Sequence, residues 1–198
     1  MEIGIIGAGG IGQAFAKHMA KAGYEVLLSN SRGPESLTSV AEQLGVNVKA
    51  ATLEEAAQAE LTFISVPWSK VEEVLKGLPS FKHRIVIDAT NPILPGFKKA
   101  DLGKKTSSQV VAELLPGAKV VKAFNTLLRE VLDADPNEGG GNRVLFYSGD
   151  DVDAKKVVGE MIRKAGFFGI DLGDLATGGR LQSFPGGPLS TLNLVKSD

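Results

Sequence analysis

Short apolar runs alternate along the chain with segments whose apolar side chains recur every three or four positions. Residues 2–7 (EIGIIG) predict a buried strand, and residues 10–23 predict an amphipathic helix that stops at Gly23. The same two signals then repeat. Further strands are predicted at 24–30, 46–50, 60–67, 84–92, 119–126, 143–149 and 167–173, and further helices at 34–45, 52–59, 69–78, 107–117 and 151–166.

This alternation predicts an α/β fold with a Rossmann-type, doubly wound and mainly parallel sheet. The first six strands and their crossover helices form the expected core, residues 1–128. The last strand–helix–strand pattern is too short to be an independent domain, so residues 142–198 are expected to extend the same sheet and to cover the substrate. The polar, glycine-rich segment 133–142 (DADPNEGGGN) between them is predicted to be a mobile loop. The chain, residues 1–198, is therefore expected to be one domain.

Charge and composition exclude several classes of function. Lysine and arginine number 22 and acidic residues 23, so no basic face for nucleic acid or an anionic membrane is expected. There is no cysteine, and His18 and His83 are the only histidines, which argues against thiol chemistry and against a metal site. No apolar run reaches about 20 residues, and the chain opens directly on a strand. We expect a cytoplasmic protein without a membrane span or leader peptide.

The glycine-rich stretch 7–12 (GAGGIG) follows the first strand and opens the first helix. Gly7 permits a tight turn, Gly9 lets the backbone approach a diphosphate, and Gly12 lets the helix pack closely on the strand. Gly10 and Ile11 begin the helix, whose free N–H groups face the phosphates. The alternative, a glycine-rich turn without a ligand, is the weaker interpretation because the motif stands in its full strand–turn–helix context.

The second strand ends at Asn30-Ser31-Arg32, where NAD-binding proteins commonly carry a carboxylate. Asn30 cannot repel a 2′-phosphate, Ser31 can donate a hydrogen bond to it, and Arg32 can form a charge-assisted fork. Gly33 lets the backbone turn nearby. The pattern favours NADP over NAD, against the alternative that Arg32 is simply a solvated residue of the loop.

Two more strand ends fall at the carboxyl edge of the sheet, where ligands of open α/β sheets bind. VPW (66–68) ends the fourth strand, and DATNP (88–92) ends the fifth. The cofactor contacts predicted there are Val66, Pro67, Trp68, Thr90, Asn91 and Pro92. Trp68 has an equally plausible structural role as a half-buried aromatic residue at a helix start, and Asp88 has one as a turn or cap residue.

The sixth strand ends in KAFNT (122–126), which offers Asn125 and Thr126 as hydrogen-bonding groups and Phe124 as an apolar wall. Strand alternation separates Lys122 and Phe124 from Asn125 unless the strand has already ended. We therefore predict that Asn125 and Thr126 position the substrate, and that Lys122 is solvated.

The remaining polar groups favour structural roles. Asp150, Asp151 and Asp153 are expected to cap the following helix, as Glu54 and Glu55 do theirs, and both histidines are expected on exposed faces. No Ser-His-Asp arrangement or metal-ligand spacing is present. Hydride transfer needs neither, because it requires two rings held at the right distance in a dry site.

These motifs together resemble one family over nearly the whole chain. The glycine loop with NSR, FISVPW (63–68), VIDATNP (86–92), KAFNT and residues 148–167 are similar to the NADPH-dependent reductases of the deazaflavin coenzyme F420. Related bacterial dinucleotide-binding proteins, the cytosolic domain of the six-transmembrane metalloreductases, and the N-terminal domain type of pyrroline-5-carboxylate reductase are similar too. NSR and VPW are the more specific elements, since the glycine loop is widespread.

The resemblance implies a homodimeric one-domain enzyme that passes hydride between NADP and a flat, flavin-like acceptor without an acid–base residue. The acceptor would be F420, FMN or FAD, with onward transfer to ferric iron or quinone. The resemblance matches Ser31 and Arg32 to the 2′-phosphate, residues 67–68 to the cofactor wall, residues 91–92 to the nicotinamide side, and Asn125 to the second ring. The family tends to have a histidine near Asn125, and the tail 180–190 (RLQSFPGGPLS) also departs from it.

Two rival functions stay open from the sequence. A small imine or hydroxyacid reductase would share the glycine loop, but it usually has a catalytic lysine in a helical domain that this chain lacks. An NADP-sensing regulator would bind cofactor without turnover, and it would show an exposed apolar patch rather than a pocket.

Overall fold

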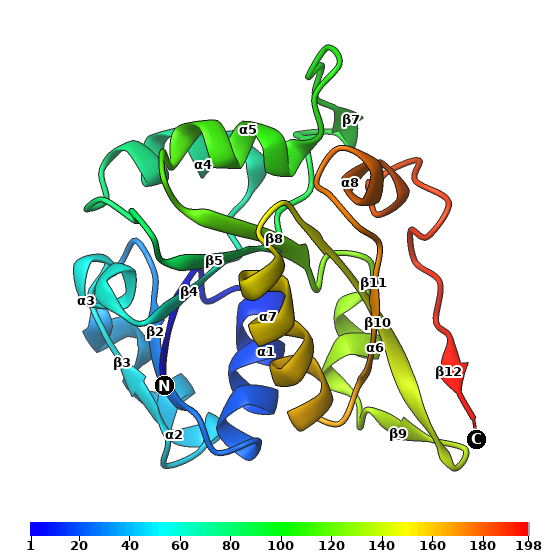
Figure 1. Ribbon diagram of the computed structural model, residues 1–198. Helices are drawn as coiled ribbons and strands as arrows, with labels where there is room; N and C mark the ends of the chain where they lie inside the picture. The colour runs from blue at the N-terminus through cyan, green and yellow to red at the C-terminus, as the bar shows by residue number, and fades with distance from the viewer. Residues whose placement is uncertain (198) are drawn as a thin grey trace.

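The computed structural model describes residues 1–197 and contains the predicted sheet (Figure 1). Six strands form its parallel part in the order β3-β2-β1-β4-β5-β8. They are β1 (Glu2–Ile6), β2 (Glu25–Ser29), β3 (Val48–Ala50), β4 (Leu61–Ile64), β5 (Ile85–Asp88) and β8 (Lys119–Ala123). This is the Rossmann order, and the strand sequence reverses direction between β1 and β4. The predicted fold class is therefore confirmed.

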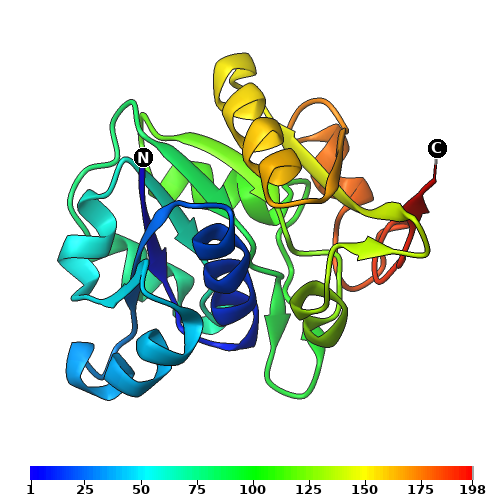
Figure 2. The same cartoon turned by 90° about the horizontal axis from the view of Figure 1, so that it is seen from below.

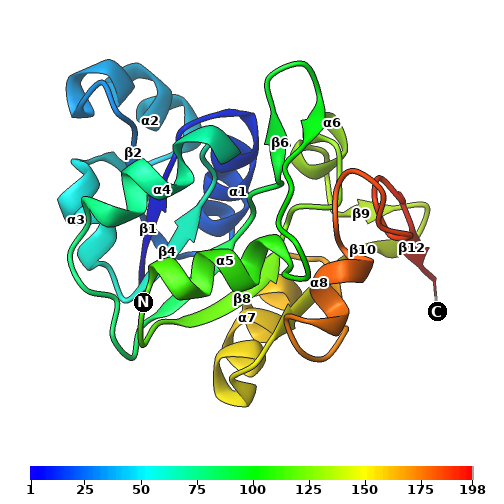
Figure 3. The same cartoon turned by 90° about the horizontal axis from the view of Figure 1, so that it is seen from above.

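Helices cover both faces of the sheet. One face carries α1 (Gly10–Lys21), α2 (Thr38–Leu44) and α7 (Val152–Lys164); the other carries α3 (Leu53–Gln58), α4 (Trp68–Lys76) and α5 (Ser107–Leu114). Figure 2 looks onto α1 and α7, and Figure 3 looks onto α4 and α5. Each face has its own apolar cluster. Since both faces of the parallel strands are covered, these strands read as continuous apolar runs.

The helix boundaries follow local sequence signals. Thr52 and Glu55 form the predicted capping box at the start of α3, with hydrogen bonds in both directions. The helix predicted at 34–45 is divided, because a 3₁₀ turn, η1 (Pro34–Leu37), precedes α2. A proline at the first position fits such a turn because it has no N–H group, and an N–H at that position would have no partner within the turn.

The C-terminal part extends the sheet as predicted. β10 (Gly141–Gly149) runs antiparallel to β8, and β11 (Phe168–Asp171) runs parallel to β10. At its other end β10 pairs with β9 (Asn137–Glu138) and β12 (Val195–Lys196). The short helices α6 (Arg129–Asp133) and α8 (Thr177–Leu181) and the hairpin of β6 (Ile93–Leu94) and β7 (Lys98–Lys99) were not predicted.

The prediction of a mobile loop at 133–142 was wrong. The segment contains the end of α6 and the tight hairpin from β9 to β10, which turns at Gly139 and Gly140. Both glycines have positive φ angles, 59° and 83°. Glycine pairs are as typical of two-residue hairpins as of loops, so the same letters fit both structures. The pairing partner, Asn142 opposite Asn137, decided between them.

Candidate functional site

In the glycine loop, the physical reason for having glycine differs from one position to the next. Gly7 has a φ of 110°, and a Cβ there would lie 2.2 Å from the Ser65 carbonyl oxygen. A Cβ on Gly12 would lie 2.0 Å from the Gly7 carbonyl oxygen. At Gly9, in contrast, no atom lies within 4 Å of the Cβ position. The fold itself thus requires glycine at positions 7 and 12, whereas Gly9 keeps an open approach to the backbone.

The N-terminus of α1 is left without a cap. Gly9 offers no side-chain hydrogen bond, and the first turn holds no acidic residue. The first N–H groups of a helix have no partner within the helix, and that end carries partial positive charge. An uncapped N-terminus beside an open glycine fits an anionic group such as a diphosphate.

Asn30 shapes the loop after β2. Its Oδ1 accepts a hydrogen bond from the Arg32 N–H at 2.8 Å, and its Nδ2 donates to Ser36 Oγ at 3.0 Å. Ser31 and Arg32 are exposed, and within residues 1–197 their side chains make no hydrogen bond or ion pair. Asn30 therefore acts through the loop conformation, which presents the hydroxyl and the guanidinium outward.

A cavity of about 440 Å³ lies between these two loops, and we call it the NSR cavity. It brings together half of the residues of the predicted cofactor site. Its lining includes Gly7, Gly9, Asn30, Ser31, Arg32, Val66 and Pro67. It also includes Lys70, a second cation that was not among the predicted residues and that pairs with Glu73 at 2.7 Å.

Trp68 does not line the NSR cavity. It begins α4, is partly buried, and packs against the apolar cluster beneath that helix. The structural role considered for it is the one observed. At this strand end the wall of the NSR cavity includes Val66 and Pro67.

A second cavity, of about 210 Å³, lies on the other side of the α1 N-terminus, and we call it the Asn cavity. Ile11, Asn91, Asn125 and Thr126 line it together. Pro92 instead lines a third cavity of about 450 Å³. The edge predicted to hold the nicotinamide is thus divided between two neighbouring hollows.

The backbone at Phe124 explains how Asn125 and Thr126 both reach this cavity. β8 ends at Ala123, and Phe124 has a φ of 62°, which breaks the alternation of the strand. A positive φ in a bulky residue is strained and persists only where packing fixes it. The Phe124 ring is fully buried, with its centroid 4.9 Å from that of Phe15.

Thr126 carries an unsatisfied hydroxyl group. Its Oγ1 is buried and has no hydrogen-bond partner within the described part of the chain, although the residue lines the Asn cavity. Buried hydroxyl groups without a partner are uncommon and call for an explanation. A ligand in the cavity would supply the missing partner.

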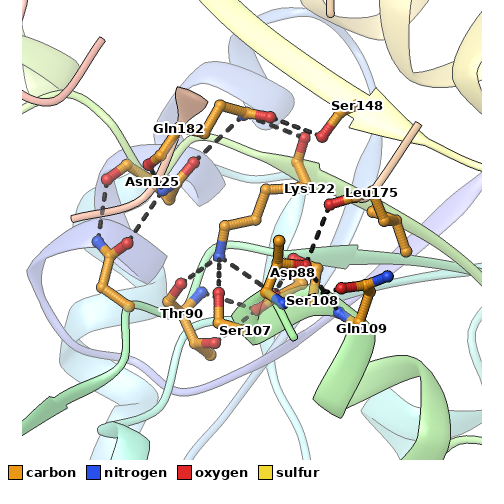
Figure 4. Close-up of polar contacts among 12 residues, drawn as sticks. Asp88, Thr90, Ser107, Ser108, Gln109, Lys122, Asn125, Ser148, Leu175 and Gln182 are labelled. Atoms are coloured by element: carbon orange, nitrogen blue, oxygen red, sulfur yellow. Dashed lines mark hydrogen bonds and ion pairs between the residues drawn. The ribbon is translucent and has the colours of Figure 1, made fainter. Parts of the chain in front are cut away.

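An amide network joins the tail to this edge (Figure 4). Asn125 Nδ2 donates to Asn91 Oδ1 at 2.9 Å and to the Gln182 carbonyl oxygen at 2.8 Å. Asn91 Nδ2 donates in return to the Asn125 carbonyl oxygen at 3.0 Å. Gln182, which is fully buried, also accepts from Ser148 Oγ at 2.7 Å. Gln182 was not among the predicted site residues, because a glutamine in a segment rich in glycine and proline gives no local signal of burial.

The prediction that Lys122 is solvated was wrong. The residue is fully buried, and its Nζ lies 3.2 Å from Asp88 Oδ2 and 3.2 Å from Ser107 Oγ (Figure 4). It also donates to the Thr90 carbonyl oxygen. Burial lowers the pKa of Lys122, and the nearby carboxylate of Asp88 opposes this shift. The residue lies on the face of β8 that contacts α5. Its charged partner, Asp88, lies 34 residues earlier on β5, so the pairing is not visible within the sequence of β8 itself.

Asp88 organises the end of β5. Its Oδ1 accepts hydrogen bonds from the Thr90 N–H at 2.8 Å and Oγ1 at 2.7 Å, and its Oδ2 accepts from Ser108 Oγ at 2.5 Å. The turn role considered for Asp88 is therefore present, together with the ion pair. Thr90 is 2% exposed and its hydroxyl faces Asp88, so it supports the edge and does not line the two cavities.

The prediction for His18 was also wrong. We expected it on an exposed face, but it is 4% exposed, and its Nε2 lies 2.6 Å from the Leu132 carbonyl oxygen. The carbonyl can only accept, so Nε2 carries the proton of the neutral ring.

His83 is exposed as predicted. Asp151 caps α7 as predicted, whereas Asp150 accepts from the Leu175 N–H instead.

Residues 1–197 hold no group of three or more side chains suited to a metal ion. Within the same residues, no helix has the length and apolar character needed to cross a bilayer.

Comparisons with known proteins agree with this geometry. Residues 2–92 match the family described as NADP oxidoreductase, coenzyme F420-dependent. The structure of the hypothetical protein SMa0349 from Sinorhizobium meliloti is 46% identical and superposes with a TM-score of 0.93, covering 100% of this chain and 96% of that one. A protein from Arthrobacter sp. FB24, described as a candidate F420-dependent NADP reductase, is 25% identical with a TM-score of 0.73, covering 89% and 86%.

The curated relatives are longer. Metalloreductase STEAP3 of Rattus norvegicus is 28% identical over 185 residues, which are 93% of this chain and 36% of that protein. Metalloreductase STEAP2 of Homo sapiens is 24% identical over 189 residues, with the same two shares. The chain thus spans about a third of the length of the curated relatives it matches.

Proposed function

Because residues 2–92 match the family of coenzyme F420-dependent NADP oxidoreductases, we propose that the chain transfers hydride between NADPH and a flat, flavin-like acceptor. The carrying observation is that the NSR cavity and the Asn cavity flank one uncapped helix N-terminus. A dinucleotide has the matching order of parts, with a phosphorylated adenosine at one end, a diphosphate, and a nicotinamide at the other.

The residues present fit such a cofactor. Gly9 leaves room for a diphosphate against the backbone, and the first N–H groups of α1 are free to bind it. Ser31 and Arg32 would hold the 2′-phosphate, and Lys70, which is paired with Glu73, lines the same cavity. Val66 and Pro67 would pack against the adenosine part. When bound, NADPH supplies the hydride itself.

On the nicotinamide side, the protein would position the bound ring and exclude water from it. Asn91 and Asn125 hold each other's amide groups and leave Thr126 Oγ1 free to donate to a bound ring. Phe124 and Ile11 give the cavity apolar walls, which exclude water from the reacting carbons. No acid–base residue is required, because hydride passes directly between the two rings.

The family match and the relatives support this class of acceptor. F420, FMN or FAD would each present a flat ring, and onward transfer to ferric iron or quinone would follow through the reduced flavin. Metalloreductases among the curated relatives make ferric iron the first onward acceptor to test.

The deciding experiment is a fluorescence titration with NADPH and NADH on the wild type, Arg32→Ala and, as a control, Arg163→Ala on α7. We expect the wild type to prefer NADPH and Arg32→Ala to lose about 2 kcal/mol of that preference, the size of a charge-assisted contact. NADPH oxidation is then followed with F420, FMN and FAD. Equal affinity for both cofactors would overturn the NADP assignment, and binding without oxidation of any acceptor would favour an NADP-sensing regulator.

A further inference from the structure

Arg129 lies across the first turn of α1. A Cβ built on Gly10 would lie 2.4 Å from Arg129 Cδ and 2.7 Å from its Nε. The arginine side chain therefore occupies the space that any larger residue at position 10 would need. Arg129 begins α6, which packs against α1 although the two helices are more than a hundred residues apart.

This contact brings two positive groups together. The N-terminus of α1 carries partial positive charge and has neither a side-chain cap nor an acidic residue in its first turn. Arg129 adds a full positive charge, and within residues 1–197 its guanidinium makes no hydrogen bond or ion pair. Two like charges at this distance repel each other. An anion beside both would turn the repulsion into two attractions.

The contact between Arg129 and Gly10 also lies between the two cavities. Gly9 lines the NSR cavity, whereas Ile11 and Arg129 line the Asn cavity. A dinucleotide with its adenosine in the first and its nicotinamide in the second must pass its diphosphate over residues 9–11.

We propose that Arg129 is a cofactor-binding residue whose guanidinium contacts the diphosphate from the side opposite the helix N-terminus. The inference rests on the proposed function, since it assigns a further residue to the same site. It gives Gly10 a role as well, because a bare Cα at this position leaves room for the arginine. The diphosphate is common to NADPH and NADH, so Arg129 strengthens the binding of both, whereas Arg32 acts on NADPH alone.

The test measures dissociation constants for NADPH and NADH with the wild type, Arg129→Ala, Arg129→Lys and Arg32→Ala. The exposed neighbour Glu130→Ala is the matched control on the same turn of α6. We expect Arg129→Ala to weaken both cofactors by a similar factor of about 10 or more, and Arg129→Lys to recover part of the loss. Glu130→Ala binds both as the wild type does. The thermal midpoint of the cofactor-free protein is recorded for each variant, to separate binding from folding.

A second set of variants tests whether Gly10 and Arg129 act together. Gly10→Ala places a methyl group where the arginine side chain runs, so we expect it to weaken binding, and the double variant Gly10→Ala/Arg129→Ala to lose less than the sum of the two. Wild-type affinity in Arg129→Ala would overturn the inference, as would a loss confined to NADPH or strictly additive effects in the double variant. If the wild type binds neither cofactor, the proposed function itself fails, which is a distinct result.

Discussion

Lys122 and Asp88 form a buried ion pair at the carboxyl edge of the sheet. Their Nζ and Oδ2 atoms lie 3.2 Å apart, with side-chain exposures of 1% and 0%. The pair joins the ends of β8 and β5, and its hydrogen bonds reach Thr90 and Ser107. The edge that carries Asn91 and Asn125 is thus held from beneath by a charged network.

Removing one member of this pair should destabilise the protein strongly. In Lys122→Met the carboxylate of Asp88 stays buried without its counter-charge, and we expect a loss of about 3–5 kcal/mol in the free energy of unfolding. The double variant Lys122→Met/Asp88→Asn should recover part of this loss, because no unpaired charge remains. Urea denaturation at pH 7 measures these two variants together with Asp88→Asn alone. Additive effects of the two substitutions would show that the pair is not coupled.

The glycine loop should separate folding from binding. In Gly9→Ala the methyl group points into open space, so we expect unchanged stability but at least about tenfold weaker binding of NADPH, since the backbone can no longer approach the diphosphate. In Gly12→Ala the methyl group meets the Gly7 carbonyl oxygen, so stability itself should fall by several kcal/mol. Thermal unfolding and cofactor titration of both variants test this. A stable Gly12→Ala protein, or a Gly9→Ala protein that binds normally, would contradict it.

The free hydroxyl of Thr126 should matter for turnover and not for folding. Thr126→Val removes a hydroxyl that has no partner, so the free energy of unfolding should change by less than about 1 kcal/mol, while the rate with NADPH and acceptor drops roughly 2- to 10-fold. Thr62→Val is the matched control. Its hydroxyl is equally buried and unpartnered but lies within β4, outside the Asn cavity. An equal loss of rate in both variants would rule out a role specific to Thr126.

His18 should make the stability depend on pH. Burial lowers its pKa below the ordinary value of 6.5, and the hydrogen bond to Leu132 partly opposes this. The unfolded chain therefore binds the proton more readily than the folded one, and protonation favours unfolding. The stabilising contribution of neutral His18 is complete above about pH 7 and declines as the pH falls below 6.5.

The comparison for this prediction is His18→Gln, whose amide N–H can still donate to the Leu132 carbonyl oxygen. Unfolding free energies are measured from pH 7.5 to pH 5 for both proteins. The wild type should lose stability relative to the variant as the pH drops. A constant difference across this range would mean that the pKa of His18 is not lowered.

The amino-acid sequence by itself determined the alternation of strands and helices, the Rossmann class of the fold, and seven of the residues around the NSR cavity. All of these depend on signals within one strand, turn and helix. The period of apolar side chains sets each element, the spacing of Gly7, Gly9 and Gly12 sets the turn, and Asn30 shapes its own loop by a local hydrogen bond. Short-range chemistry of this kind is legible in a single stretch of the chain.

Only the tertiary structure decided the rest of the site. Lys122 is buried because α5 packs over β8, Gln182 because the tail folds back onto the edge, and Arg129 meets Gly10 because α6 docks on α1. In each case the partner lies in another element of the fold, and a polar side chain carries the same letter whether it is solvated or paired. Burial and pairing arise from packing between elements, which no local period encodes.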